Sequence, residues 1–127
     1  TYGAVILLGG DERLVIEDDL WALILNLCFR AIPTLVAGER AVVPMFSYGG
    51  EVALEPSQTK IIVSVDGDVV GHFPATALIR VLHDCGERYL AACHALPDPD
   101  GALAEWIVAF EHDLPAAAIA IRKLSPS

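Results

Sequence analysis

The chain has 127 residues, of which 54% are hydrophobic, and its 17 acidic and eight basic side chains give a formal net charge of −9. This length fits a single globular domain over residues 1–127, and the apolar content excludes intrinsic disorder. The negative charge disfavours nucleic acid and anionic membranes as partners. No apolar run reaches the roughly 18 residues that a membrane-spanning helix needs.

The N-terminal residues predict a β-hairpin followed by the start of a helix. Residues 4–8 form a short apolar run, residues 9–11 have turn chemistry, and residues 13–16 predict a returning strand. The acidic run 17–19 then predicts a helix start. A carboxylate there can cap the first turn, and it interacts favourably with the positive end of the helix dipole.

Residues 20–36 are apolar on nearly every side, which predicts a long N-terminal helix that is packed on two sides. Pro33 should kink or divide this helix, because proline has no backbone N–H to donate. Ala37 and Gly38 provide a C-terminal stop. We therefore expect this helix in the interior of the protein.

Residues 41–73 predict an antiparallel meander. Pro44 lies inside the first strand candidate, which favours an edge strand or a bulge. Asp66 and Gly67 separate two strand-like runs. Together they supply the positive φ angles that a tight hairpin turn needs.

Two to three helices should follow the meander. An apolar stripe that includes Leu78, Leu82 and Cys85 predicts a helix that ends near residue 96. After a second helix, Pro115 should begin a last short helix over residues 116–124, and a strand over residues 118–121 is the alternative. The predicted fold class is α+β, with a mostly antiparallel sheet packed against the long apolar N-terminal helix and two to three C-terminal helices.

The sequence contains no catalytic or metal-binding motif. His83 and His94 are eleven positions apart, about 16 Å along a helix, which is too far for one metal ion. Cys93 and His94 have no second ligand pair at zinc spacing. No phosphate-binding, dinucleotide-binding or nucleophile-elbow motif occurs. We therefore expect no metal, no cofactor and no enzymatic activity.

The three cysteines, Cys28, Cys85 and Cys93, are interpreted as small buried apolar residues. Cys85 and Cys93 lie eight positions apart in one predicted helix, about 12 Å along its axis, which is too far for a disulfide. Unpaired cysteines are typical of a reducing cytoplasm, where we expect the protein to reside.

The acidic residues are the candidate binding site. Glu51 and Glu55 should point to the same side of one strand, because strand side chains repeat every two positions. Tyr48 is a candidate aromatic anchor beside them. A solvated surface that only keeps the protein soluble is the alternative interpretation. The candidate partner-binding face consists of Asp11, Glu12, Tyr48, Glu51, Glu55, Glu105, Glu111 and Asp113.

These features predict a non-enzymatic protein-binding module whose negative face neutralises a basic protein partner. In size, acidity and mixed α/β composition the chain is similar to small bacterial immunity proteins, and this resemblance implies a toxin as the partner. One alternative is a small-ligand-binding protein or enzyme with a pocket between sheet and helices, with His72 and His112 as its first candidate residues. Another is a structural subunit that forms a homodimer through residues 20–29.

Overall fold

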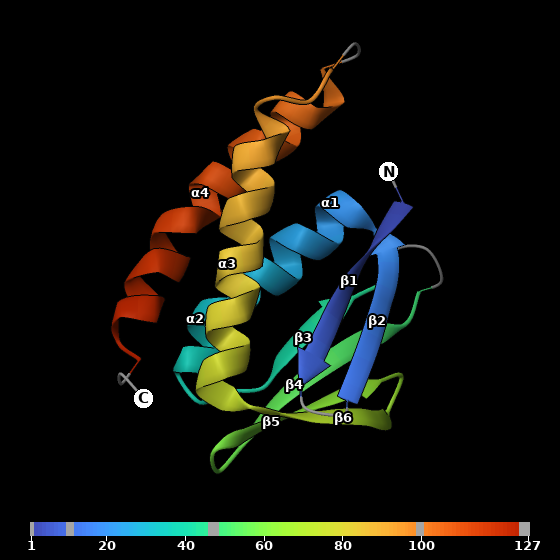
Figure 1. Ribbon diagram of the computed structural model, residues 1–127, viewed down its shortest axis with the longest axis vertical. Helices are drawn as coiled ribbons and strands as arrows, with labels where there is room; N and C mark the ends of the chain where they lie inside the picture. Colours follow the sequence, from blue (N-terminus) through green and yellow to red (C-terminus); the bar gives the residue numbers. More distant parts are fainter. Residues whose placement is uncertain (1, 10–11, 46–48, 99–100, 125–127) are drawn as a thin grey trace.

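The computed structural model describes residues 2–9, 12–45, 49–98 and 101–124. Its fold is α+β, as the sequence predicts, but its strands form two antiparallel sheets and not one (Figure 1). The first sheet is a hairpin of strands β1 (Tyr2–Gly9) and β2 (Glu12–Asp19). The second is a four-stranded meander in the order β3-β4-β5-β6, and a helical segment connects the two sheets.

The β1–β2 hairpin has one face on the core and one face in solvent. Val5 and Leu14 belong to its buried side, whereas Ile6 and Val15 are exposed and lie directly opposite each other in the register. This alternation is the period-two pattern of an antiparallel pair that is covered on one side. The predicted hairpin is therefore confirmed, with strands longer than the sequence indicated.

The predicted long apolar N-terminal helix is not supported. The segment is divided into α1 (Leu20–Leu23), a π-helix η1 (Ile24–Arg30) and α2 (Ala31–Val36). At the end of η1 the Ala31 N–H donates to the Asn26 carbonyl, five residues earlier, which is π-helical geometry. Pro33 provides a physical reason for the break, because its ring would clash with the carbonyl of residue 29 in a regular α-helix.

Carboxylates cap the start of two helices. Asp19 Oδ1 accepts a hydrogen bond from the Trp21 N–H at 3.2 Å, so the predicted capping by this acidic run is confirmed at its last residue. Asp98 accepts from the N–H groups of Leu103 at 3.0 Å and Ala104 at 2.8 Å. Each bond satisfies a backbone donor that has no partner within its own helix.

The predicted meander is confirmed. Its strands are β3 (Ala41–Pro44), β4 (Glu51–Ser57), β5 (Lys60–Val65) and β6 (Asp68–Pro74). Strand β3 lies at the edge of this sheet, as Pro44 predicted. Asp66 and Gly67 turn the chain between β5 and β6 with φ angles of 52° and 89°, so the hairpin predicted there is also confirmed.

Two long helices, α3 (Ala75–Cys93) and α4 (Ala102–Arg122), follow the sheet. The predicted helix boundary at Pro115 is wrong, since α4 continues through this residue. Ala117 and Ala120 lie beyond Pro115 and are buried. Their packing offsets the hydrogen bond that proline cannot donate.

The helices form layers on one side of the four-stranded sheet (Figure 1). Segments α2 and α3 contact the sheet, and α4 packs on η1, α2 and α3. Aromatic rings join these elements: Phe29 and Phe110 lie 5.7 Å apart between centroids, and Trp21 and Trp106 lie 6.3 Å apart. Within the described residues, no helix is long and apolar enough to cross a membrane.

Candidate functional site

The acidic residues of the predicted face lie on different layers of the molecule. Glu51 and Glu55 are on β4, whereas Glu105, Glu111 and Asp113 are on α4, which packs against helices. The structure therefore does not bring these five residues onto one surface. Asp11, Tyr48 and the side chain of Glu12 lie outside the described residues.

Asp113 holds two elements together. Its carboxylate accepts a hydrogen bond from Arg30 Nε at 2.7 Å and lies 3.1 Å from His112 Nδ1, and it thereby ties α4 to η1. Burial raises the pKa of this carboxyl, but the hydrogen bonds and positive charge of Arg30 and His112 bring it below its ordinary value. The charge of Asp113 is compensated within the fold, so this residue is a weak candidate for contact with a partner.

A second group of carboxylates gathers at one end of the four-stranded sheet. Glu51 begins β4, and Asp66 and Asp68 flank the turn between β5 and β6; we call these three residues the acidic sheet end. The Glu51 N–H donates to Asp66 Oδ1 at 2.8 Å, and the Asp66 N–H donates to the Glu51 carbonyl at 2.9 Å. These bonds fix the backbone of the turn.

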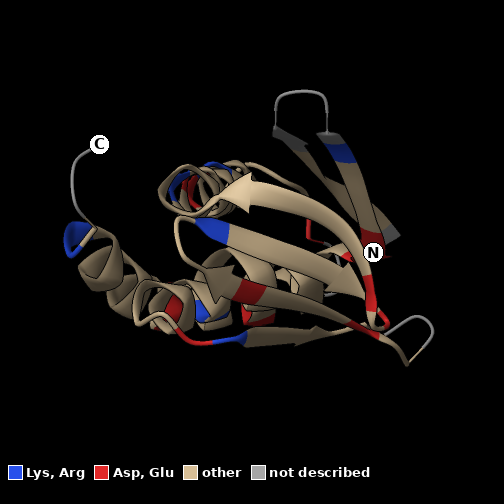
Figure 2. Cartoon of the chain, turned by 90° about the horizontal axis from the view of Figure 1, so that it is seen from below, with Lys and Arg blue, Asp and Glu red and all other residues tan. Residues whose placement is uncertain are grey.

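No basic side chain of the described residues compensates the charge of the acidic sheet end. Within the described part of the chain, no lysine or arginine forms an ion pair with Glu51, Asp66 or Asp68. Glu55, farther along β4, differs because its Oε2 lies 3.5 Å from Arg40 Nε. Figure 2 shows acidic residues gathered where β4 begins and β5 turns into β6, with basic residues toward the opposite end of these strands.

Exposed valines lie beside the acidic sheet end. Val42 and Val69 occupy the same row across the sheet, one on each edge strand, and they are 44% and 57% exposed. Val70, which is 43% exposed, is the additional residue of a β-bulge opposite Val63 and Ser64. This side of the sheet faces away from the residues that pack on the helices, and it carries Glu51. Asp68 lies in a row of the covered side, so the uncompensated negative charge stands at the end of the apolar surface.

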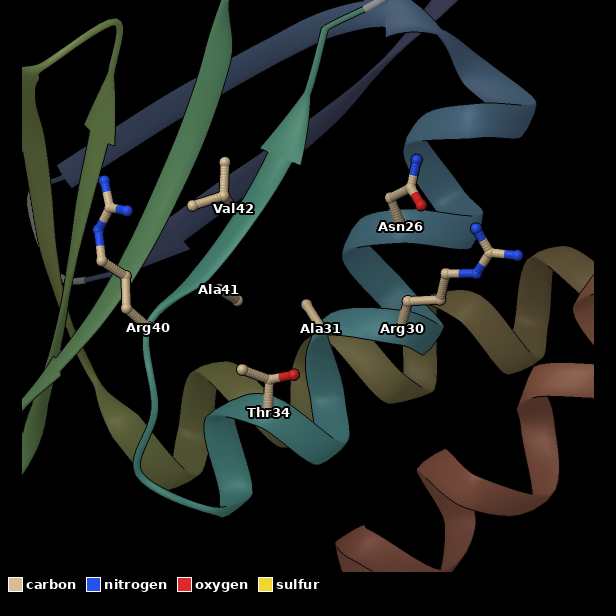
Figure 3. Close-up of a pocket in the computed structure, with 7 residues that line it drawn as sticks. All are labelled: Asn26, Arg30, Ala31, Thr34, Arg40, Ala41 and Val42. Atoms are coloured by element: carbon tan, nitrogen blue, oxygen red, sulfur yellow. The ribbon is translucent and has the colours of Figure 1, made fainter.

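A pocket of about 240 Å³ lies between β3 and the segment formed by η1 and α2 (Figure 3). Small side chains, Ala31 and Ala41 among them, line it and leave space between strand and helix. Arg30 and Arg40 also line the pocket, and each of them is paired with a carboxylate. The sequence offered a pocket between sheet and helices as an alternative but did not point to these residues, because the two arginines belong to different elements and no motif connects them.

The histidines do not converge on a catalytic centre. His72 is on β6 and His112 is on α4, and neither lines the pocket between β3 and the helical segment. His83 is buried on α3, with Nδ1 3.3 Å from Glu87 Oε1, and its Nε2 has no hydrogen-bond partner among the described residues. Among the residues that the structure describes, no group of three or more histidines, cysteines and carboxylates is placed to hold a metal ion.

Two cysteines that sequence reasoning treated separately are neighbours in the fold. The thiols of Cys28 on η1 and Cys85 on α3 are hydrogen-bonded to each other. They are 57 positions apart, so only the packing of the two helical segments brings them together. Gly86, next to Cys85, is the one sequence signal for such a close approach.

Comparison of the chain with protein-family models, curated proteins and solved structures finds no match. The function is therefore argued from the geometry and charge of the sites described above.

Proposed function

We propose that the protein is a non-enzymatic protein-binding module that docks a basic protein partner on the open side of its four-stranded sheet. The observation that carries this proposal is the acidic sheet end, whose three carboxylates have no ion-pair partner among the described residues and lie beside exposed valines. Of the residues predicted from the sequence, Glu51 and Glu55 belong to this side of the sheet.

The carboxylates and the valines of this surface have different roles in the proposed complex. Glu51 and Asp68 attract a cationic surface over a long range and raise the rate of association. Val42 and Val69 supply apolar area, whose removal from water stabilises a formed complex by about 25 cal/mol per Å². Asp66 also holds the turn through its bond to the Glu51 N–H, so it contributes to the shape of the surface as well as to its charge.

The proposed partner is a protein with a basic surface, such as a toxin that this protein neutralises. The resemblance of the chain to small bacterial immunity proteins in size and acidity supports this class of partner. The net charge of −9 supports it too, because that charge disfavours nucleic acid and anionic membranes. Homodimerisation through residues 20–29 has less support, since most of the apolar residues in this segment are buried within the chain itself.

The test compares a double variant of the sheet with a matched double variant of α4. Glu51→Gln with Asp68→Asn removes two charges from the acidic sheet end, and Glu105→Gln with Glu111→Gln removes two exposed charges from α4. Each protein is immobilised and used to capture partners from a lysate of the source cells. We expect the wild type and the α4 variant to retain the same basic protein, and the sheet variant to lose it.

A kinetic measurement with the captured protein sharpens the test. The association rate of the wild type should fall about tenfold or more between low and high ionic strength, and that of the sheet variant should depend much less on salt. Equal capture by both double variants, or an association rate that is insensitive to salt, would contradict docking at the acidic sheet end.

The pocket beside β3 supports a second candidate, a small-ligand-binding protein that takes an anionic ligand. Its specific support is that two arginines line the pocket, since guanidinium groups bind carboxylates and phosphates through paired hydrogen bonds. In Figure 3 the two guanidinium groups point away from each other, so both side chains must turn toward the pocket to hold one anion. An incoming anion would compete with Glu55 for Arg40 and with Asp113 for Arg30.

Titration calorimetry with inorganic phosphate and with a small dicarboxylate tests this candidate. Arg40→Gln should abolish any binding. Arg88→Gln, which removes an exposed arginine paired with Asp84 on α3 at 3.0 Å, should leave it unchanged. Loss of binding in both variants would indicate a general effect of charge and would exclude the pocket as the site.

A further inference from the structure

A close contact between η1 and α3 places two thiols side by side. A Cβ atom added to Gly86 on α3 would lie 3.0 Å from Cys28 Cβ and 3.2 Å from the Cys28 carbonyl oxygen on η1. Cys85 precedes Gly86 in α3, and its thiol is hydrogen-bonded to that of Cys28. The absence of a side chain at Gly86 therefore allows η1 and α3 to approach closely enough for the two sulfurs to meet.

The two thiols differ in their access to solvent. Cys28 is completely buried, whereas Cys85 is half-buried and is therefore the one that a small molecule reaches. The third cysteine, Cys93, is buried at the C-terminal end of α3, eight positions beyond Cys85. It provides an internal control, since it belongs to the same helix.

The two thiols also differ in their readiness to ionise. The hydrogen bond from Cys28 lowers the pKa of Cys85 to about 7, with a further contribution from Arg88, although burial and Asp84 oppose the shift. The pKa of Cys28 is raised well above its ordinary value by the same hydrogen bond and by burial. At neutral pH Cys85 therefore carries a substantial thiolate fraction, and Cys28 keeps its proton.

We propose that Cys28 and Cys85 form a reactive dithiol site that takes a low-molecular-weight disulfide, such as oxidised glutathione, as its oxidant. Cys85 is the attacking thiolate because it is accessible, and Cys28 is the resolving thiol because it lies against the Cys85 sulfur. The product is a disulfide that joins η1 to α3. This site is separate from the proposed docking surface and does not depend on it.

The reaction is two successive thiol–disulfide exchanges. The Cys85 thiolate attacks one sulfur of the small disulfide, the sulfur–sulfur bond breaks, and one small thiolate leaves. Cys28 then loses its proton to solvent and attacks the Cys85 sulfur, which releases the second small thiolate. Both protein thiols are oxidised, and the small disulfide is reduced to two thiols. The negative charge of Cys85 is gone after the first exchange, which removes its contribution to the raised pKa of Cys28.

The test incubates the full chain with oxidised glutathione under exclusion of air and follows intact mass and free thiols. We expect two of the three free thiols to be lost, a mass decrease of two hydrogens, and recovery of all three thiols with dithiothreitol. Peptide mapping of the oxidised wild type should identify a Cys28–Cys85 bond. This last measurement requires no variant, so it stays informative even if a substitution at buried Cys28 disturbs folding.

Variants separate the two roles. Cys28→Ala should stop at the first exchange and keep one glutathione on Cys85, and Cys85→Ala should lose the reaction. Cys93→Ala is the matched control and should react like the wild type. A wild type that keeps all three thiols, a disulfide that includes Cys93, or a Cys85→Ala variant oxidised as fast as the wild type would each overturn the proposal.

Discussion

On one side of the four-stranded sheet Leu54 and Val63 are fully buried under the helices, while on the other side Val42 and Val69 are 44% and 57% exposed. All four belong to the same small sheet, and the alternation of side chains along each strand separates them. The covered side therefore stabilises the fold, and the open side, which contributes little to the core, is the side on which we propose docking. Substitutions on each side, measured separately, test this division of roles.

The largest effect is expected on the covered side. Leu54→Ala should lower the free energy of unfolding by about 2–5 kcal/mol, because it removes buried methyl groups and leaves a cavity. Urea denaturation monitored by circular dichroism measures this change. A loss below about 1 kcal/mol would mean that the sheet does not depend on this core contact.

A substitution in the helix layer that covers the sheet should destabilise the protein almost as much. Gly86→Ala should destabilise the protein by about 1–3 kcal/mol, because the added Cβ would lie 3.0 Å from Cys28 Cβ and the helices must move apart. Alanine otherwise favours a helix over glycine by about 1 kcal/mol. Thermal unfolding decides between these effects, and a variant more stable than the wild type would show that η1 and α3 are not tightly packed.

A smaller, pH-dependent effect is expected where α4 is tied to η1. Asp113→Asn should lower the free energy of unfolding by no more than about 1 kcal/mol at neutral pH, because the Arg30 side chain of this ion pair is largely exposed. The pKa of Asp113 is lowered in the folded protein, so its contribution is present above its unfolded pKa of about 3.9 and fades as the pH falls through the folded value. Urea denaturation at pH 7 and at pH 3 should show a smaller difference in the free energy of unfolding between variant and wild type in acid.

The smallest effect on stability is expected on the open side. Val69→Ala removes apolar surface that is already in water, so the free energy of unfolding should change by less than about 0.5 kcal/mol. Val63→Ala, the same substitution on the covered side, is the control, and it should lower the free energy of unfolding more than Val69→Ala does. If the two variants lower the free energy of unfolding equally, the open side is more deeply packed than its exposure indicates, and its proposed role in docking fails.

The sequence predicted those elements that depend on neighbouring residues. Asp66 and Gly67 predicted the β5–β6 hairpin because their positive φ angles are a local requirement. Pro44 predicted an edge strand because a missing N–H excludes a central one. Asp19 was recognised as a cap from the acidic run that precedes an apolar helix.

The remaining features depend on packing between distant parts of the chain. Pro33 and Pro115 look alike in sequence, yet one follows a π-helix and the other lies inside an unbroken α-helix. The sequence also did not predict that the acidic residues of β4 and α4 lie apart, because only the tertiary structure assigns these elements to different layers. For the same reason the Cys28–Cys85 contact, across 57 positions, had only Gly86 as a local signal, and a glycine alone does not name its partner.

Each strand of the four-stranded sheet is paired with the strand that precedes or follows it in the chain. Contacts of this kind are local in sequence, and proteins rich in local contacts fold faster than those in which distant segments must meet. Only short loops need to close for β4, β5 and β6 to assemble. We therefore expect this sheet to form early in folding, before α3 and α4, which follow it in the chain, complete the cover on its inner side.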